Sequence, residues 1–136
     1  MIGIDTNILL RALADDDKKQ SPRAQAFLLE RTVDDPAVVN AVVLAELVWV
    51  MRTKYKSSRD EVVAILDDLI CNPAFVILER ESVLAALQDY REGIGGFTDV
   101  LIAQINSAAG CGTTVSFDKG APAQSGFTIL TPDLAP

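Results

Sequence analysis

Residues 1–13 read MIGIDTNILLRAL, an apolar stretch that is interrupted by three consecutive polar residues, Asp5, Thr6 and Asn7. The residues before the interruption predict a short buried strand over Ile2–Asp5. Thr6 or Asn7 would then cap a helix, because a short polar side chain there accepts a hydrogen bond from an otherwise unpaired backbone N–H. The opening stretch therefore predicts a strand that ends at an acid and passes directly into a helix.

The rest of the chain continues this alternation of strands and helices. Further strands are predicted over Val38–Asn40, Phe75–Leu78, Thr113–Phe117 and Phe127–Leu130. Helices are predicted over Arg23–Arg31 with Ser21 as its cap, Ala41–Lys54, Ser58–Ile70, Glu81–Arg91, and from a Thr98 cap to Asn106. Such an order favours a three-layer α/β/α sandwich around a mainly parallel sheet. At 136 residues, the chain fits a single domain over residues 1–136.

The composition excludes several classes of enzyme. The chain has no histidine, so no imidazole can act as a base or a metal ligand, which excludes Ser-His-Asp and Cys-His mechanisms and most zinc sites. Nineteen acidic and twelve basic residues give a net charge of −7, which disfavours non-specific binding to nucleic acid. The cluster of Arg52, Lys54, Lys56 and Arg59 is either a local basic patch or a solvated helix end.

Cysteine usage and hydropathy indicate a cytoplasmic protein. Cys71 and Cys111 are far apart and form neither a disulfide framework nor a zinc ligand set, which suits a reducing compartment. The apolar run Ala41–Met51 is interrupted by Glu46 and is shorter than the roughly 20 apolar residues that span a bilayer. The N-terminus has no basic segment before a long apolar stretch. We therefore expect no membrane span and no secretory signal.

Four acids interrupt the apolar pattern of the chain. Asp5 ends the first strand, Glu46 lies within VVLAELVWV, Asp99 precedes VLIA, and Asp118 follows the strand TTVSF. Each acid lies at the carboxyl end of a predicted strand or in a helix that follows one. Because ligands of parallel sheets bind beyond the carboxyl ends of the strands, the four acids could converge on one edge.

Each acid also has an ordinary structural explanation. Asp5 could cap the first helix, and Asp99 could stabilise a helix N-terminus through the macrodipole. Glu46 could reach solvent or pair with a basic residue further along its helix, although acids are seldom found among buried Val, Leu and Trp. Asp118 could begin a turn. These explanations require four independent coincidences of position, whereas a shared site requires one cause.

Four carboxylates in one pocket would repel one another strongly, and a divalent cation would remove this conflict. Oxygen ligands without sulfur or imidazole favour Mg²⁺ or Mn²⁺, and such an ion suits hydrolysis of a phosphodiester, because it activates water and stabilises the leaving oxygen. Asn7 and Ser116 are then supporting hydrogen-bonding residues. Without a shared site, they are ordinary turn and strand residues.

Four segments, taken in order, resemble one family. IDTNILL, VVLAELVWV, FTDVLIA and VSFDKG together resemble the PIN domain, and more narrowly the small VapC-type ribonuclease toxins of toxin–antitoxin pairs. The resemblance spans essentially the whole chain. It implies Mg²⁺- or Mn²⁺-dependent endonucleolytic cleavage of RNA, often tRNA or rRNA. It also implies a homodimer and inhibition by a cognate antitoxin protein whose C-terminal segment covers the acidic groove.

The resemblance also assigns roles to residues of this chain. It implies that Asp5 and Asp99 bind the metal directly, while Glu46 and Asp118 complete the shell, bind a second ion or activate water. The residues that match the supporting polar positions of the family are Thr6, Asn7 and Ser116.

Two other functions remain as alternatives to the nuclease. The first is a non-catalytic binding or regulatory module that keeps the same fold, although the presence of all four acids argues against it. The second is a phosphoacceptor receiver domain, which also gathers acids at strand ends around Mg²⁺. A receiver would need paired acids beside its first strand, and this chain has only Asp5 there.

Overall fold

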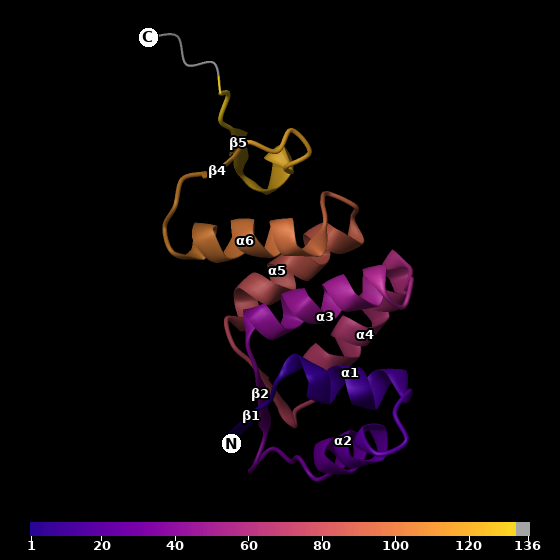
Figure 1. Cartoon of the computed structure of the whole chain (residues 1–136). Helices are drawn as coiled ribbons and strands as arrows, with labels where there is room; N and C mark the ends of the chain where they lie inside the picture. Colours follow the sequence, from indigo (N-terminus) through magenta and orange to yellow (C-terminus); the bar gives the residue numbers. More distant parts are fainter. Residues whose placement is uncertain (133–136) are drawn as a thin grey trace. The chain divides into compact units, whose positions relative to one another are not determined.

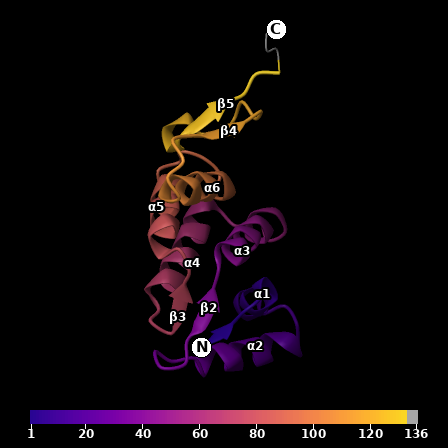
Figure 2. The ribbon, with the colours of Figure 1, turned by 90° about the vertical axis from the view of Figure 1, so that its left-hand side faces the viewer.

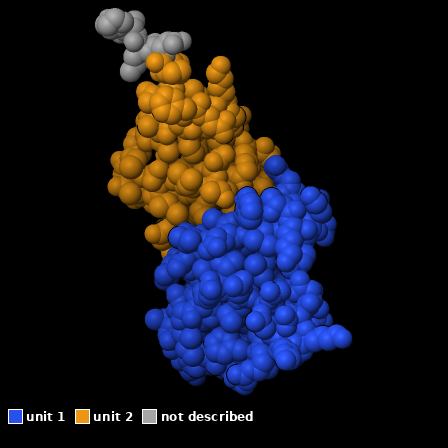
Figure 3. Space-filling view, in the orientation of Figure 1, with its two compact units in different colours: residues 1–78 blue, residues 79–136 orange. Residues whose placement is uncertain are grey.

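The computed structural model describes residues 1–132. The chain divides into two compact units, Met1–Leu78 and Glu79–Pro136, which are coloured separately in Figure 3. Each unit is described by itself below. No helix of the described residues is long and apolar enough to cross a membrane.

The first unit is built on a parallel sheet of three short strands, β1 (Ile2–Gly3), β2 (Ala37–Val39) and β3 (Phe75–Ile77). The strands follow the order β1-β2-β3, with Ile2 beside Ala37 and Val39 beside Ile77, and Figure 2 shows β1 and β2 next to each other. A pair of helices connects each strand to the next, as the crossover of a parallel pair requires. The carboxyl ends of β1 and β2 therefore lie at one edge of the sheet.

Helices account for most of the first unit, and Figure 1 shows their order along the chain. They are α1 (Thr6–Ala14), α2 (Gln20–Leu29), α3 (Ala41–Thr53) and α4 (Arg59–Cys71). Leu44 and Leu47 of α3 and Leu66 of α4 are fully buried together with Val39 of the sheet. Burying a leucine side chain contributes on the order of 2 kcal/mol, so this aliphatic core supports the strand ends.

Helix starts follow capping chemistry, but two predicted caps are wrong in this unit. The cap of α1 is Asp5, not Thr6 or Asn7, because Asp5 has extended backbone and its side chain accepts the Thr6 N–H. Helix α2 begins at Gln20, because the Asp17 carboxylate accepts the N–H groups of Lys19 and Gln20, so Ser21 lies inside the helix.

The bounds of α4 lie within one residue of the predicted range Ser58–Ile70. Ser58 and Glu61 form a reciprocal capping box at the start of the helix. Asn72, the residue before Pro73, ends the helix with an extended conformation. The capping box and the residue before proline are predictable from sequence because each depends on contacts within one helical turn.

The second unit contains two long helices and a parallel pair of strands. Its elements are α5 (Arg80–Arg91), α6 (Phe97–Ala108), β4 (Thr114–Ser116), the short 3₁₀ helix η1 (Ala123–Ser125) and β5 (Phe127–Ile129). Helices α5 and α6 pack against each other, and Tyr90 meets Phe97 edge to face with ring centroids 5.8 Å apart. Every strand pair among residues 1–132 is parallel, so the predicted α/β fold around mainly parallel strands is confirmed.

The Gly-rich turn before α6 is held by a close contact with the loop before η1. A Cβ atom built on Gly95 would lie 2.9 Å from Cγ of Pro122, which is buried. A proline ring cannot move aside as a flexible side chain can. Gly95 is therefore required for close approach, whereas Gly96, the N-cap of α6, has open space around it.

We expect Gly95→Ala to destabilise the protein by about 1–3 kcal/mol, because the added methyl group overpacks against Pro122. Urea unfolding followed by circular dichroism measures this change. Gly96→Ala is the matched control and should stay within about 1 kcal/mol, which is the size of ordinary glycine-to-alanine effects. Equal unfolding midpoints for the two variants would contradict the assigned role of Gly95.

Candidate functional site

Asp5 lies at the carboxyl end of β1. The Ile4 N–H continues the pairing with β2 by donating to the Val38 carbonyl at 3.1 Å, so the backbone is held up to the residue before Asp5. Oδ1 of Asp5 accepts the Thr6 N–H at 2.7 Å, and the residue is exposed. Asp5 therefore caps α1 with one carboxylate oxygen, and the described residues form no hydrogen bond with its Oδ2.

Glu46 is held by Thr6 from the neighbouring element. The Thr6 hydroxyl, in a residue only 4% exposed, donates to Oε1 of Glu46 at 3.3 Å, which joins α1 to α3 across 40 residues of sequence. Among residues 1–132, Glu46 forms no ion pair with Arg52 or Lys54, but the residue is exposed, so of the two ordinary explanations the one in which Glu46 reaches solvent is confirmed. Thr6 thus connects Asp5 and Glu46 through its backbone N–H and its hydroxyl, and these three residues are here called the β1-end cluster.

Asn40 is a further candidate that the sequence analysis did not select. It directly follows β2, while Asp5 follows the last residue that pairs with β2, Ile4, so both polar residues come after the carboxyl ends of neighbouring strands. Oδ1 of Asn40 accepts the Val43 N–H at 3.0 Å and caps α3. The sequence feature that could have indicated Asn40 is its position as a polar residue directly after the strand Ala37–Val39. The amide of Asn40 gives this edge of the sheet a hydrogen-bond donor.

Asn7, in the first turn of α1, is exposed, and its side chain has no hydrogen bond with the described residues. It lines a groove between α1 and α2. The predicted supporting role of Asn7 beside Asp5 therefore rests on sequence adjacency alone.

Asp99 occupies the third position of α6 in the second unit and is half-buried. The cap of this helix is Gly96, with extended backbone and no side-chain hydrogen bond, so the predicted cap at Thr98 is wrong. With no polar side chain at the cap, Asp99 is the acidic residue that faces the positive end of the helix dipole in its first turn. This position allows both the ordinary explanation of Asp99 and a role as a ligand.

Asp118 begins a turn after β4. Its Oδ1 accepts the Gly120 N–H at 2.8 Å, and its own N–H donates to the hydroxyl of Ser116 at 3.0 Å. Ser116 therefore binds the backbone of Asp118 and not its carboxylate, and its supporting role in a shared site stays a prediction. Asp118 is exposed, and the second carboxylate oxygen has no hydrogen bond with the described residues.

The predicted site residues divide between the two units. Asp5, Thr6, Asn7 and Glu46 belong to Met1–Leu78, whereas Asp99, Ser116 and Asp118 belong to Glu79–Pro136. Within residues 1–132, no group of three or more acidic or cysteine side chains is placed to hold a metal ion. The convergence of all four acids would join residues of both units, and it stays a prediction.

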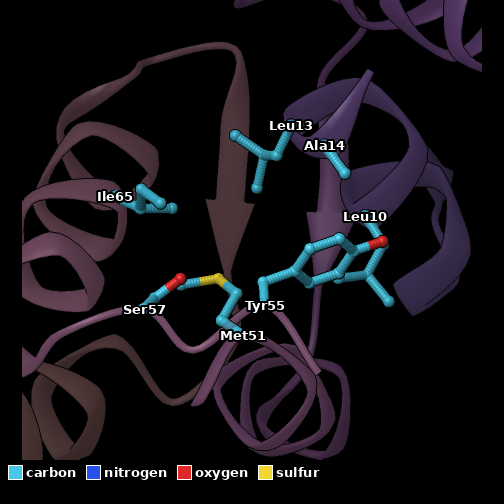
Figure 4. Close-up of a pocket in the computed structure, with 7 residues that line it drawn as sticks. All are labelled: Leu10, Leu13, Ala14, Met51, Tyr55, Ser57 and Ile65. Carbon is cyan, nitrogen blue, oxygen red and sulfur yellow. The ribbon is translucent and has the colours of Figure 1, made fainter. Parts of the chain in front are cut away.

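A separate hollow in the first unit is apolar. It is lined by Leu10, Leu13 and Ala14 of α1, Met51 of α3, Ile65 of α4, and Tyr55 and Ser57 of the connecting loop, and it has a volume of about 170 Å³ (Figure 4). No carboxylate lines it, so it offers nothing to a cation.

Comparison with known families identifies the chain. Residues 2–124 match the PIN domain family, so the match runs through both units and most of the chain. The protein therefore belongs to the PIN domain family, in accord with the predicted α/β/α fold. PIN domains are typically nucleases and generally use divalent metal ions. No curated protein matches the sequence.

Proposed function

We propose that the protein is a metal-dependent endoribonuclease of the VapC type, the toxin of a toxin–antitoxin pair. Membership of the PIN domain family supports a nuclease. The β1-end cluster is the single observation that carries the assignment to this chain, because Thr6 connects two of the candidate acids: its backbone N–H binds Asp5, and its hydroxyl binds Glu46 of an apolar helix. A receiver domain or an inert module would not need this pairing.

The donor chemistry of the proposed site fits Mg²⁺ or Mn²⁺. Asp5, Glu46, Asp99 and Asp118 would hold the ion or ions with carboxylate oxygens, which such hard cations prefer. When bound, the ion lowers the pKa of a water molecule and places positive charge beside the leaving oxygen. Because Oδ1 of Asp5 is occupied by the Thr6 N–H, its Oδ2 is the oxygen available to a ligand.

The residues of the chain then position the reactants and move the proton. The Thr6 hydroxyl orients the Glu46 carboxylate through Oε1, which leaves Oε2 to accept a proton from the attacking water. A bond forms between the water oxygen and phosphorus, the bond from phosphorus to the 3′ oxygen breaks, and the 3′ oxygen takes up a proton. The products are a 3′ hydroxyl and a 5′ phosphate.

The proposal includes the partners of the enzyme. Its substrate is RNA, with tRNA and rRNA as the first candidates, and it acts as a homodimer in the cytoplasm. A cognate antitoxin protein inhibits it by covering the acidic site with a C-terminal segment. The net charge of −7 favours selective over general binding of RNA, which suits an enzyme that cuts few sites.

Sequencing of RNA ends after incubation of purified protein with total RNA and Mg²⁺ tests the function. We expect a small set of new 5′ phosphate ends, paired with 3′ hydroxyl ends, that are absent from the sample without protein. Ends that carry a cyclic phosphate would indicate attack by the 2′ hydroxyl and contradict hydrolysis by water. An unchanged pattern of ends would contradict the ribonuclease assignment.

A further inference from the structure

A groove with two arginines lies between α1 and α2 of the first unit. Asn7, Ile8 and Arg11 line it from α1, and Gln20, Arg23 and Phe27 line it from α2, around a volume of about 370 Å³. The α2 residues recur at intervals of three and four, so they form one face of that helix. The groove is mixed in character: two guanidinium groups, two amides and an aromatic ring.

Arg11 is held in place at this groove. Its Nε donates to Oε1 of Gln20 at 2.9 Å, and its Nη1 donates to Oδ1 of Asp16 at 3.2 Å. The hydrogen bond from the Tyr55 hydroxyl, followed by those from Arg11, keeps the pKa of Asp16 below its ordinary value of 3.8. Asp16 therefore stays charged at neutral pH and fixes the Arg11 side chain, whose charge is partly balanced.

Arg23 differs from Arg11 in having no such partner. Among residues 1–132, no acid forms an ion pair with Arg23, and its side chain is exposed. Arg31, one helical turn beyond Phe27, is instead paired with Asp35 at 2.8 Å and stacks over the Phe27 ring at 4.4 Å. An unpaired guanidinium in a groove of an acidic protein is suited to bind an anionic ligand.

The groove begins close to the proposed catalytic residues. Asn7, which lines it, is two residues after Asp5, the N-cap of α1, so the groove and Asp5 share the N-terminal end of that helix. An RNA strand whose scissile phosphate lies at this end of α1 can continue along the helix into the groove. Phosphate oxygens accept bidentate hydrogen bonds from guanidinium groups, and the amides of Asn7 and Gln20 suit sugar and phosphate oxygens.

We propose that the α1–α2 groove binds the phosphate backbone of the RNA strand beside the bond that is cut, with Arg23 as its principal phosphate contact. This inference rests on the proposed ribonuclease function and names the substrate-binding surface for it. Arg23 is a binding residue in this assignment and takes no part in the bond-breaking step. Its removal should therefore weaken substrate binding and leave the chemical step unchanged.

Steady-state cleavage of a mapped RNA substrate with Mg²⁺, measured over a range of KCl concentrations, tests the proposal. Arg23→Ala should raise KM about tenfold, the effect of losing a hydrogen bond to a charged group, with kcat within about twofold of wild type. The dependence of log(kcat/KM) on log[KCl] should become shallower by about 0.7, the value for one lost phosphate contact on a single strand. Arg23→Lys should restore the slope, because it keeps the charge.

Arg52→Ala is the matched control, because Arg52 is exposed in the same unit and its Nη1 donates to the Ser57 carbonyl. It should keep KM and the salt slope within about twofold of wild type. Wild-type values for Arg23→Ala, or equal losses in both variants, would overturn the groove while leaving the ribonuclease intact. If the wild-type protein cuts no RNA, the proposed function fails and this inference fails with it.

Discussion

Asp5→Asn is expected to lower ribonuclease activity at least about a hundredfold, and Asp99→Asn to lower it as strongly, because both substitutions remove a carboxylate from the proposed metal site. Asparagine keeps the shape of the side chain and a carbonyl oxygen that can accept the Thr6 N–H. Since asparagine is also a favoured N-cap, α1 should remain capped in Asp5→Asn. The loss should therefore appear in kcat and not in the amount of folded protein.

Asp34→Asn is the control for this pair, because Asp34 is an exposed loop acid outside the proposed site. It should cleave RNA at the wild-type rate. Without metal, Asp5→Asn and Asp99→Asn should be as stable to heat as wild type or more stable, because repulsion between carboxylates is relieved. Cleavage by Asp99→Asn at the wild-type rate would remove Asp99 from the site and leave the helix-dipole explanation.

Removal of divalent metal with EDTA is expected to stop cleavage completely, and addition of Mg²⁺ or Mn²⁺ in excess of the chelator to restore it. The physical reason is that the chain has no histidine, so no imidazole can take a proton from water near neutral pH. Water bound to a divalent ion is far more acidic than free water, so the ion makes a nucleophile available near neutral pH. Initial rates on a mapped RNA measure the effect.

A second measurement separates metal binding from catalysis. Mn²⁺ should raise the melting temperature of metal-free wild-type protein, because a ligand that binds only the folded state stabilises it in proportion to RT ln(1 + [L]/Kd). Asp5→Asn should show a smaller rise than wild type, and Asp34→Asn the full rise. Cleavage that resists EDTA would contradict metal dependence and would point to a metal-independent ribonuclease in the preparation.

Local features of the fold were predictable because they depend on neighbours in the sequence. The alternation of short apolar runs with amphipathic segments predicted the elements to within a few residues, including β3 (Phe75–Ile77) and α3 (Ala41–Thr53). The N-cap residue of a helix was harder to predict, because several residues that could serve as the cap are adjacent in the sequence at the start of the helix. At α1, the residue with extended backbone is Asp5, and at α6 it is Gly96. Backbone conformation, and not residue type, decided between them.

The candidate site likewise has some features that the sequence predicts and others that depend on tertiary packing. That an acid ends the first strand and another lies inside an apolar helix can be read directly from the chain. That the Thr6 hydroxyl reaches Glu46, or that Arg23 lacks an acidic partner while Arg11 has one, depends on how helices pack. Packing also decided which apolar residues of α3 are buried: Leu47 is fully buried, whereas Trp49 is 66% exposed.

The sequence by itself determined the α/β class, the order of the elements, the absence of imidazole chemistry and the positions of the acids, because each depends on composition or on contacts within a turn or two. Only the tertiary structure decided which polar atoms meet. Thr6 and Glu46 are 40 residues apart, and their hydrogen bond forms because burial of the aliphatic core brings α1 and α3 together. Side-chain partners at that separation follow from packing, which local preference does not encode.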